Sequence, residues 1–307
     1  MQGVVVLLRV FLLLTIVTAK DDTPSIYDEM VEIPGAAFSM GSDDSKGRDG
    51  ESPSKLVRVK SFTIDKYPVT SGQFRKFVRD TKYKTDAEKF GWSFVFASHL
   101  DTKIREGITQ SVPGAPWWLP VNRAYWRQPE GPGSSIKERM NYPALHTSYN
   151  DAVKYCEWAG KRLVTESEWE LAARGGLKGK EYPWGSKFER SRMNIWQGKF
   201  PDENTKDDGY SGASPVDAYK PQNKYGLHDM VGNVWEWVSS EFQEPNDQPS
   251  AEKKYVLRGG SYLDSQDGSF NHLARVTTRM GNTPDSGSDN MSFRCAKSLQ
   301  SRNKSDL

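Results

Sequence analysis

The sequence is poor in the residues and motifs that usually carry chemistry. Only two of its 307 residues are cysteines, and there is no C-x-x-C motif. A G-x-S-x-G motif, a phosphate-binding G-x-x-x-x-G-K-[ST] motif and histidines at H-x-x-x-H spacing are also absent. These absences argue against the common metal, hydrolase and nucleotide sites, although a Ser-His-Asp group assembled from distant segments stays open. The four histidines are His99, His146, His228 and His272.

An excess of one charge is absent as well. The chain has 42 Lys and Arg residues against 40 Asp and Glu residues, and the signs are mixed along its length. We therefore exclude nucleic acid as a partner. Because cores of up to roughly 250–300 residues stay single, and because aromatic residues make up 12% of the chain, one large domain with a sizeable core is expected.

Long hydrophobic runs are missing after the N-terminus. The first nineteen residues hold two short apolar runs split by Arg9 and end at Ala19. This pattern is too short to span a bilayer and predicts a secretory signal peptide at 1–19, with a signal anchor as the alternative. Residues 20–29 are polar and are expected to form a linker. We predict a soluble mature protein with no membrane partner.

The C-terminus resembles a retrieval signal. The last four residues, Lys304-Ser305-Asp306-Leu307, are similar to KDEL. We therefore interpret 298–307 as a tail that, together with the signal peptide, predicts the lumen of the endoplasmic reticulum.

Cys156 and Cys295 lie 139 positions apart. In an oxidising lumen the simplest interpretation is one disulfide, which at this loop size could stabilise the fold by about 5 kcal/mol. Two buried thiols, or one reactive cysteine, remain the alternatives from the residues alone. If the bond forms, no thiol is left for chemistry.

Periodicity predicts strands in the first part of the domain and three helices. Apolar and polar residues alternate over 30–41, and a second strand is expected over 56–64. A helix is expected after Thr70 or Ser71, because Phe74, Phe77 and Val78 form one apolar face.

The middle of the chain is less regular. Residues 89–143 are rich in aromatics, Gly and Pro, and we expect a packed irregular loop there. A helix over 150–158 is expected with Asn150 as its cap, and another over 166–174, where Thr165 and Glu168 form a capping box. Beyond Gly175 the sequence predicts turns and short strands.

Several phrases together resemble the sulfatase-modifying factor family, also called the formylglycine-generating enzyme family. They are FSMGS at 38–42, FTIDKYPVTSGQFRKFV at 62–78, PALHTSYNDAVKYCEWAGKRLVTESEWELAARGG at 143–176, YPWG at 182–185, NIWQGKFP at 194–201, YGLHDMVGNVWEW at 225–237 and RGGSY at 258–262. The resemblance implies a single compact, asymmetric α+β domain over 30–297, with little regular secondary structure and a C-type lectin-like fold. It also places Cys156 and Cys295 at paired structural cysteines.

The resemblance fails at the active site. The family carries two reactive cysteines just after GGSY, where this chain has the run 263–269, and Asp264 and Ser269 stand nearest to them. The family enzyme holds Cu(I) between these thiolates and oxidises a substrate cysteine to formylglycine. Soft thiolates select Cu(I), whereas oxygen ligands do not. The chain therefore resembles the noncatalytic branch of the family, and we expect neither copper nor enzymatic activity.

Calcium is the ligand that the resemblance implies. Calcium takes six to eight oxygen ligands, and loops with little secondary structure offer spare carbonyls. Without the resemblance, the acidic segment from 194 to 210 would equally be a solvated loop. Two structural sites are expected. The first uses the side chains of Asn194 and Asp208 with the carbonyls of Ile195 and Tyr210, and the second uses Asp229 and Glu236 with the carbonyls of Gly232 and Val234.

A peptide groove is also implied around the lost site. Trp235 and Ser261 fall at positions that line the family's substrate groove, next to Asp264, although Trp235 could equally belong to the core. Arg258, Asn271 and Arg275 are expected nearby. Two sequons make Asn290 and Asn303 candidates for glycosylation.

Three functions fit these features. The first is a noncatalytic lumenal protein that binds sulfatases or the active formylglycine-generating paralogue and modulates sulfatase maturation, with a homodimer possible. The second is an oxidase with residual or altered activity on cysteine peptides, using Asp264 and a histidine with another metal. The third is a calcium-dependent lectin-like module.

Overall fold

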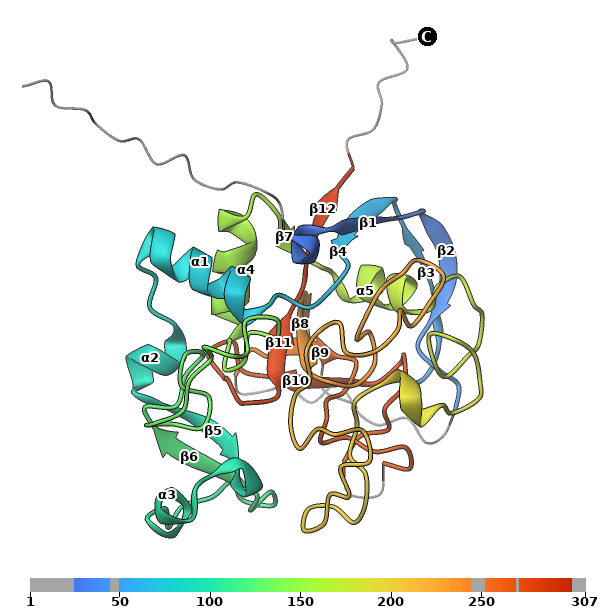
Figure 1. Ribbon diagram of the computed structural model, residues 1–307. Helices are drawn as coiled ribbons and strands as arrows, with labels where there is room; N and C mark the ends of the chain where they lie inside the picture. The colour runs from blue at the N-terminus through green and yellow to red at the C-terminus, as the bar shows by residue number, and fades with distance from the viewer. Residues whose placement is uncertain (1–24, 45–49, 244–251, 269–270, 300–307) are drawn as a thin grey trace, which may run out of the picture.

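The computed structural model describes residues 25–44, 50–243, 252–268 and 271–299. The predicted signal peptide at 1–19, most of the linker, Ser269, Asn303 and the retrieval signal at 304–307 lie outside the described residues. Within them, short strands and helices are joined by long ordered loops (Figure 1). The fold is therefore a mixed α+β structure with little regular secondary structure, as the sequence predicts.

The first sheet joins the two ends of the domain. Its strand order is β1-β4-β12-β7, and every pair is antiparallel. The last strand therefore lies between strands from early and middle parts of the sequence. The strands are β1 (Met30–Ile33), β4 (Phe62–Asp65), β12 (Cys295–Ser298) and β7 (Arg162–Leu163).

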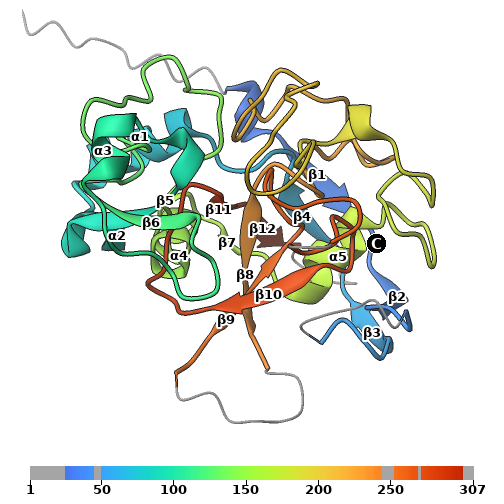
Figure 2. The same cartoon turned by 90° about the horizontal axis from the view of Figure 1, so that it is seen from below.

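The second sheet lies at the centre of the molecule (Figure 2). Its order is β10-β9-β8-β11, and β11 pairs with β8 in parallel while the other pairs are antiparallel. Two hairpins, β2–β3 and β5–β6, complete the strands. The bounds are β8 (Trp235–Glu241), β9 (Tyr255–Arg258), β10 (Arg279–Asn282), β11 (Met291–Phe293), β2 (Ala36–Met40), β3 (Lys55–Val59), β5 (Trp92–Phe96) and β6 (Trp118–Asn122).

The helices flank the central sheet, with α1 and α4 together on one side and α5 beside the β2–β3 hairpin on the other (Figure 1). The residues expected to form the apolar face of α1 are all buried, in one core cluster with Trp126 and Trp237. The helices are α1 (Ser71–Thr81), α2 (Asp86–Phe90), α3 (Thr102–Glu106), α4 (Tyr149–Trp158) and α5 (Glu166–Ala173), with 3-10 turns η1 (Ile26–Asp28), η2 (Ala97–His99) and η3 (Arg190–Arg192).

The residues that cap the helices in the structure can be compared with the caps predicted from the sequence. Thr70 caps α1, and the Thr165–Glu168 capping box of α5 is confirmed. The predicted cap of α4 is wrong, because the Ser148 hydroxyl accepts the hydrogen bond from the Asp151 amide. Asn150 instead lies inside the first turn of the helix.

Three other predictions need correction. The strand expected over 30–41 is broken after Ile33 by Pro34, which cannot donate to a ladder, so β1 and β2 join different sheets. The strand expected over 56–64 divides between the same two sheets. Residues 89–143 are not wholly irregular, because β5 and β6 pair there over a small apolar core that contains Val95, Leu119 and Val121.

Candidate functional site

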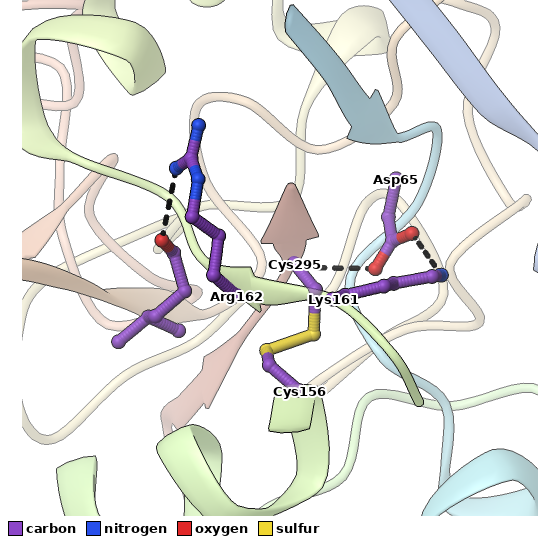
Figure 3. The surroundings of a disulfide bond; sticks show 6 residues. Asp65, Cys156, Lys161, Arg162 and Cys295 are labelled. Atoms are coloured by element: carbon purple, nitrogen blue, oxygen red, sulfur yellow. Dashed lines mark hydrogen bonds and ion pairs between the residues drawn. A yellow bond between two sulfur atoms is a disulfide. The ribbon is translucent and has the colours of Figure 1, made fainter. Parts of the chain in front are cut away.

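The two cysteines are joined to each other. Cys156 on α4 and Cys295 on β12 form a disulfide with their Cα atoms 5.7 Å apart (Figure 3). Beside it, the buried Asp65 carboxylate accepts hydrogen bonds from the Cys295 amide at 2.9 Å and from Lys161 Nζ. Because these are the only cysteines of the chain, no thiol remains for copper binding or for thiol chemistry. The disulfide also indicates a protein of the secretory pathway.

Asp264 is one of the two residues nearest to the positions where the resemblance expects thiols. Its Oδ2 accepts hydrogen bonds from the Ser261 amide at 2.7 Å and from Ser261 Oγ at 2.9 Å. Its Oδ1 accepts one from the His272 amide at 3.1 Å, and His272 Nδ1 lies 3.4 Å away. Both carboxylate oxygens are thus used to hold the turn 261–264 against the segment that carries His272.

The same residues settle whether a Ser-His-Asp triad forms here. Asp264 lies between Ser261 and His272, whereas a triad needs the histidine between the serine and the aspartate so that imidazole can take the serine proton. The Ser261 side chain is also completely buried. The group therefore has a positioning role within the turn and no activated nucleophile.

The predicted groove residues come together, but in the interior. Trp235, Ser261 and Asp264 are 2%, 0% and 3% exposed. The Trp235 ring lies 4.9 Å from the half-buried His272 ring, at a near-perpendicular angle. Asn290, which the sequence suggested only for glycosylation, is buried here and donates from its Nδ2 to Ser261 Oγ at 3.1 Å. Glycosylation at Asn290 remains a prediction.

Of the three residues expected nearby, only Asn271 joins this cluster. Its side-chain amide donates to the Leu263 carbonyl. Arg258 lies at the end of β9 and pairs with Glu166 at 3.1 Å and with Glu170 at 2.5 Å. Arg275 pairs with Glu51 and Asp44. The two arginines are therefore engaged in ion pairs with other segments.

The first expected calcium set combines a buried amide with a half-exposed loop carboxylate. Asn194 is buried, and its Nδ2 donates to the Gly212 carbonyl at 2.9 Å. Asp208 accepts from the Tyr210 amide at 3.0 Å and from the Tyr219 hydroxyl at 2.9 Å. The donor chemistry of these oxygens fits a hard cation.

The second set divides into two unlike carboxylates. Asp229 is buried and accepts from Asn233 Nδ2 at 2.7 Å, and burial raises the pKa of its carboxyl to about 7 against the opposing effect of that hydrogen bond. Glu236 accepts from Arg294 at 2.6 and 2.7 Å and from Trp169 Nε1 at 2.8 Å. Asp229 thus fits a cation ligand, whereas both Glu236 oxygens are already committed to Arg294.

Asn233 links the two sets, and the sequence analysis missed it. Its Nδ2 donates to Asp229, its Oδ1 accepts from Asn194 Nδ2 at 3.3 Å, and its amide donates to the Asn194 carbonyl at 2.8 Å. Its φ of 64° lies in the left-handed region, which Asn tolerates better than most residues. The G-N dipeptide at 232–233 was the available signal. In the described residues, no three His, Cys, Asp or Glu side chains gather as a metal site, so a bound ion would depend on amides and carbonyls.

A large cavity lies beside the Asp264 cluster. It has a volume of about 1080 Å³, and Tyr262 and Asp289, the neighbours of Ser261 and Asn290, form part of its wall. Asp289 also accepts from His99 at 2.8 Å. Burial lowers the pKa of His99, but this hydrogen bond and the charge of Asp289 outweigh it and raise the pKa above its usual value. The sequence analysis did not identify this cavity.

None of the helices in the described ranges is both long and apolar enough to cross a bilayer.

Comparison with known proteins identifies the fold and the family. The family described as "Sulfatase-modifying factor enzyme 1-like domain" matches residues 17–299. The chain is 58% identical to the inactive C-alpha-formylglycine-generating enzyme 2 of Bos taurus over 267 residues, covering 87% of each chain. It is 49% identical to the formylglycine-generating enzyme of Mus musculus over 286 residues, covering 89% of this chain and 76% of the relative.

Among solved structures, PvdO from Pseudomonas aeruginosa superposes with a TM-score of 0.59 at 26% identity, covering 88% of this chain and 94% of PvdO. The predicted fold class is thus confirmed. With both of its cysteines bonded to each other, the chain belongs to the sulfatase-modifying factor family as a member without that family's catalytic thiols.

Proposed function

We propose that the protein is a noncatalytic family member that resides in the lumen of the endoplasmic reticulum. There it binds sulfatases, or the active formylglycine-generating enzyme, and modulates sulfatase maturation. The relatives named as inactive formylglycine-generating enzyme 2 support this proposal by their 55–58% identity. The disulfide and the signals at both ends of the sequence support the location.

One observation carries the noncatalytic part of the proposal. Copper-dependent oxidation of a substrate cysteine needs two soft sulfur ligands. At Asp264 the chain offers a carboxylate whose two oxygens accept hydrogen bonds from Ser261 and His272. The residue therefore holds the turn closed in the place where the active enzymes present a nucleophile.

The chemical test uses a cysteine peptide derived from a sulfatase. Incubated with the protein, copper and oxygen, the peptide should gain no aldehyde detectable by mass spectrometry. Aldehyde formation above the level without protein would overturn the proposal. The double variant Asp264→Cys with Ser269→Cys is the matched positive test, because it restores two thiols and should bind Cu(I) where the natural chain does not.

Binding needs its own test. The protein, immobilised on a sensor, should capture an unfolded sulfatase or the active enzyme from purified solution, and folded bovine albumin serves as the control. Capture of neither sulfatase nor active enzyme contradicts the proposal whatever the chemical test shows. The mass of the native particle in solution decides whether the protein is a dimer.

Calcium is proposed as a structural ligand of the loops around Asn194 and Asp229. The support is the set of hard oxygen donors and the buried Asp229 carboxylate, which no described lysine or arginine pairs. Chelation should lower the melting temperature by several degrees, and added calcium should restore it. Asp208→Asn and Asp229→Asn should each reduce the chelator effect, whereas an identical melt with and without chelator would contradict bound calcium.

A further inference from the structure

A basic groove lies away from the Asp264 cluster, where α1, the end of α4, the turn η1 and the first sheet meet (Figure 1). Its volume is about 980 Å³. None of its lining residues belongs to the cluster around Asp264 or to the expected calcium sets. A function for this groove is therefore independent of the proposed function.

The charge of the groove differs from that of the whole chain. Five cations line it against two carboxylates, although the chain as a whole is nearly neutral. One carboxylate, Asp28, is occupied by hydrogen bonds from Gln73 Nε2 at 2.8 Å and from the Ser25 amide at 3.1 Å. The other, Glu138, is exposed. The cations are Lys76, Arg79, Lys137, Lys161 and Lys297.

Three of these cations lack a compensating charge. Lys161 pairs with Asp65, and Arg79 contacts Asp80 at 3.3 Å. Lys76, Lys137 and Lys297 are exposed and have no ion pair with any described carboxylate. Lys76 Nζ lies over the Trp158 ring at 5.7 Å, which turns its charge toward the groove wall that α4 provides. The groove therefore presents a positive field to solvent.

The groove also offers apolar surface between the charges. Met140, Trp158 and the edge of the buried Tyr155 line it together with the Asn141 side-chain amide. Apolar contacts of this kind accept large side chains, while an amide can bind a main chain. A small inorganic anion would use only the lysines, whereas a peptide would use both kinds of surface.

The disulfide stabilises this arrangement. Cys156 follows Tyr155 on α4, and Cys295 begins the strand that carries Lys297 (Figure 3). The bond therefore fixes the α4 wall of the groove against the β12 wall. A groove held covalently is preorganised, and binding then costs less ordering of the protein.

We propose that this groove binds an extended acidic peptide segment that carries at least one large apolar side chain. Carboxylates of the segment pair with Lys76, Lys137 and Lys297, and the apolar side chain packs on Trp158 and Met140. The charge match steers association and weakens as salt screens it.

The test uses the full mature chain with its disulfide intact and a fluorescent synthetic peptide of alternating Glu and Leu. Anisotropy should show binding that weakens with salt, and the peptide with Gln in place of Glu should bind much less. Lys76→Glu with Lys137→Glu should weaken binding by at least about tenfold. The milder double variant Lys76→Gln with Lys137→Gln should lose less affinity for the peptide. It serves as the test if the Lys76→Glu with Lys137→Glu variant does not fold.

The matched control reverses two lysines outside the groove. Lys178 and Lys180 are exposed and line none of its walls. Lys178→Glu with Lys180→Glu changes the net charge equally and should alter affinity by less than about twofold. The proposal is overturned if the groove variant and the control variant lose the same affinity for the peptide. It is also overturned if the Glu and Gln peptides bind equally well. Binding to heparin is measured with the same variants. If the groove variants lose heparin binding while their peptide binding is unchanged, the proposal is overturned and the ligand of the groove is a sulfated polysaccharide.

Discussion

Glu236 and Asp151 are both buried carboxylates, but the fold neutralises them differently. Glu236 accepts two hydrogen bonds from the Arg294 guanidinium and one from Trp169. Asp151 has no described cation within ion-pair distance, and it accepts only from neutral groups, the Tyr83 hydroxyl and the amides of Asp86 and Ser148. The first carboxylate is paired with a guanidinium, whereas the second is surrounded by neutral donors.

The difference appears in the pKa of Asp151. Burial, opposed by the Ser148 amide and assisted by the nearby Asp86 charge, raises the pKa of this carboxyl to about 7. A buried carboxylate held only by neutral donors therefore titrates near neutral pH, and Asp151 places such a group between α4 and α2.

Removing the cation from the first carboxylate should have the largest effect. Arg294→Met leaves Glu236 buried without a partner and should cost about 3–5 kcal/mol of unfolding free energy. Urea denaturation followed by tryptophan fluorescence measures this loss. In the double variant Arg294→Met with Glu236→Gln, the loss should be smaller, because no charge is stranded. An unchanged denaturation midpoint for the single variant would show that Glu236 does not need Arg294.

The second prediction concerns the dependence of stability on pH. The folded pKa of Asp151 lies near 7, above the usual value of about 4. The folded state therefore binds more protons in this interval, and stability falls as pH rises from about 4 through 7. Asp151→Asn has no charge to lose and should reduce this slope, leaving the part contributed by Asp229, whose pKa burial also raises to about 7. Denaturation midpoints measured across this range test it, and Glu236→Gln is the comparison that should leave the Asp151 slope in place.

The smallest effect is expected at Asp264, a third carboxylate held mainly by neutral donors. Asp264→Ala removes the acceptors for Ser261 and for the His272 amide and should cost about 1–3 kcal/mol. The same denaturation measurement applies. Since no chemistry is expected at this position, the variant should leave the aldehyde assay blank, as for the natural chain.

Local sequence signals predicted the elements whose partners are close in the chain. The Thr70 cap and the buried Phe74, Phe77 and Val78 follow from spacing within one helix. The β5–β6 hairpin escaped prediction because its strands are 21 residues apart, between Phe96 and Trp118, and are stabilised by packing on Leu100 and Ala124. The sequence offers Asn150 as the cap of α4, whereas Ser148, which is of an equally common capping type, takes that position in the structure.

In the candidate site, too, features with a local sequence signal could be predicted, and features that depend on distant segments could not. Loss of the reactive cysteines is visible in the sequence, and the disulfide was implied by the resemblance. The sequence left open whether Trp235 lines a groove or belongs to the core, and the structure places it in the core. The ion pair of Glu236 with Arg294 could not be predicted, because the two residues are 58 positions apart in the chain. Asn233 was overlooked because an amide in a G-N turn has no distinctive pattern.

The strand β12 lies between β4 and β7 and carries Cys295, so the first sheet lacks its inner member until residues 295–298 have been made. Cys156 enters an oxidising compartment 139 residues ahead of the cysteine it must find. During that interval its thiol can be oxidised by the wrong partner. Correct folding of this protein should therefore depend on a disulfide-exchange catalyst that acts once Cys295 is available.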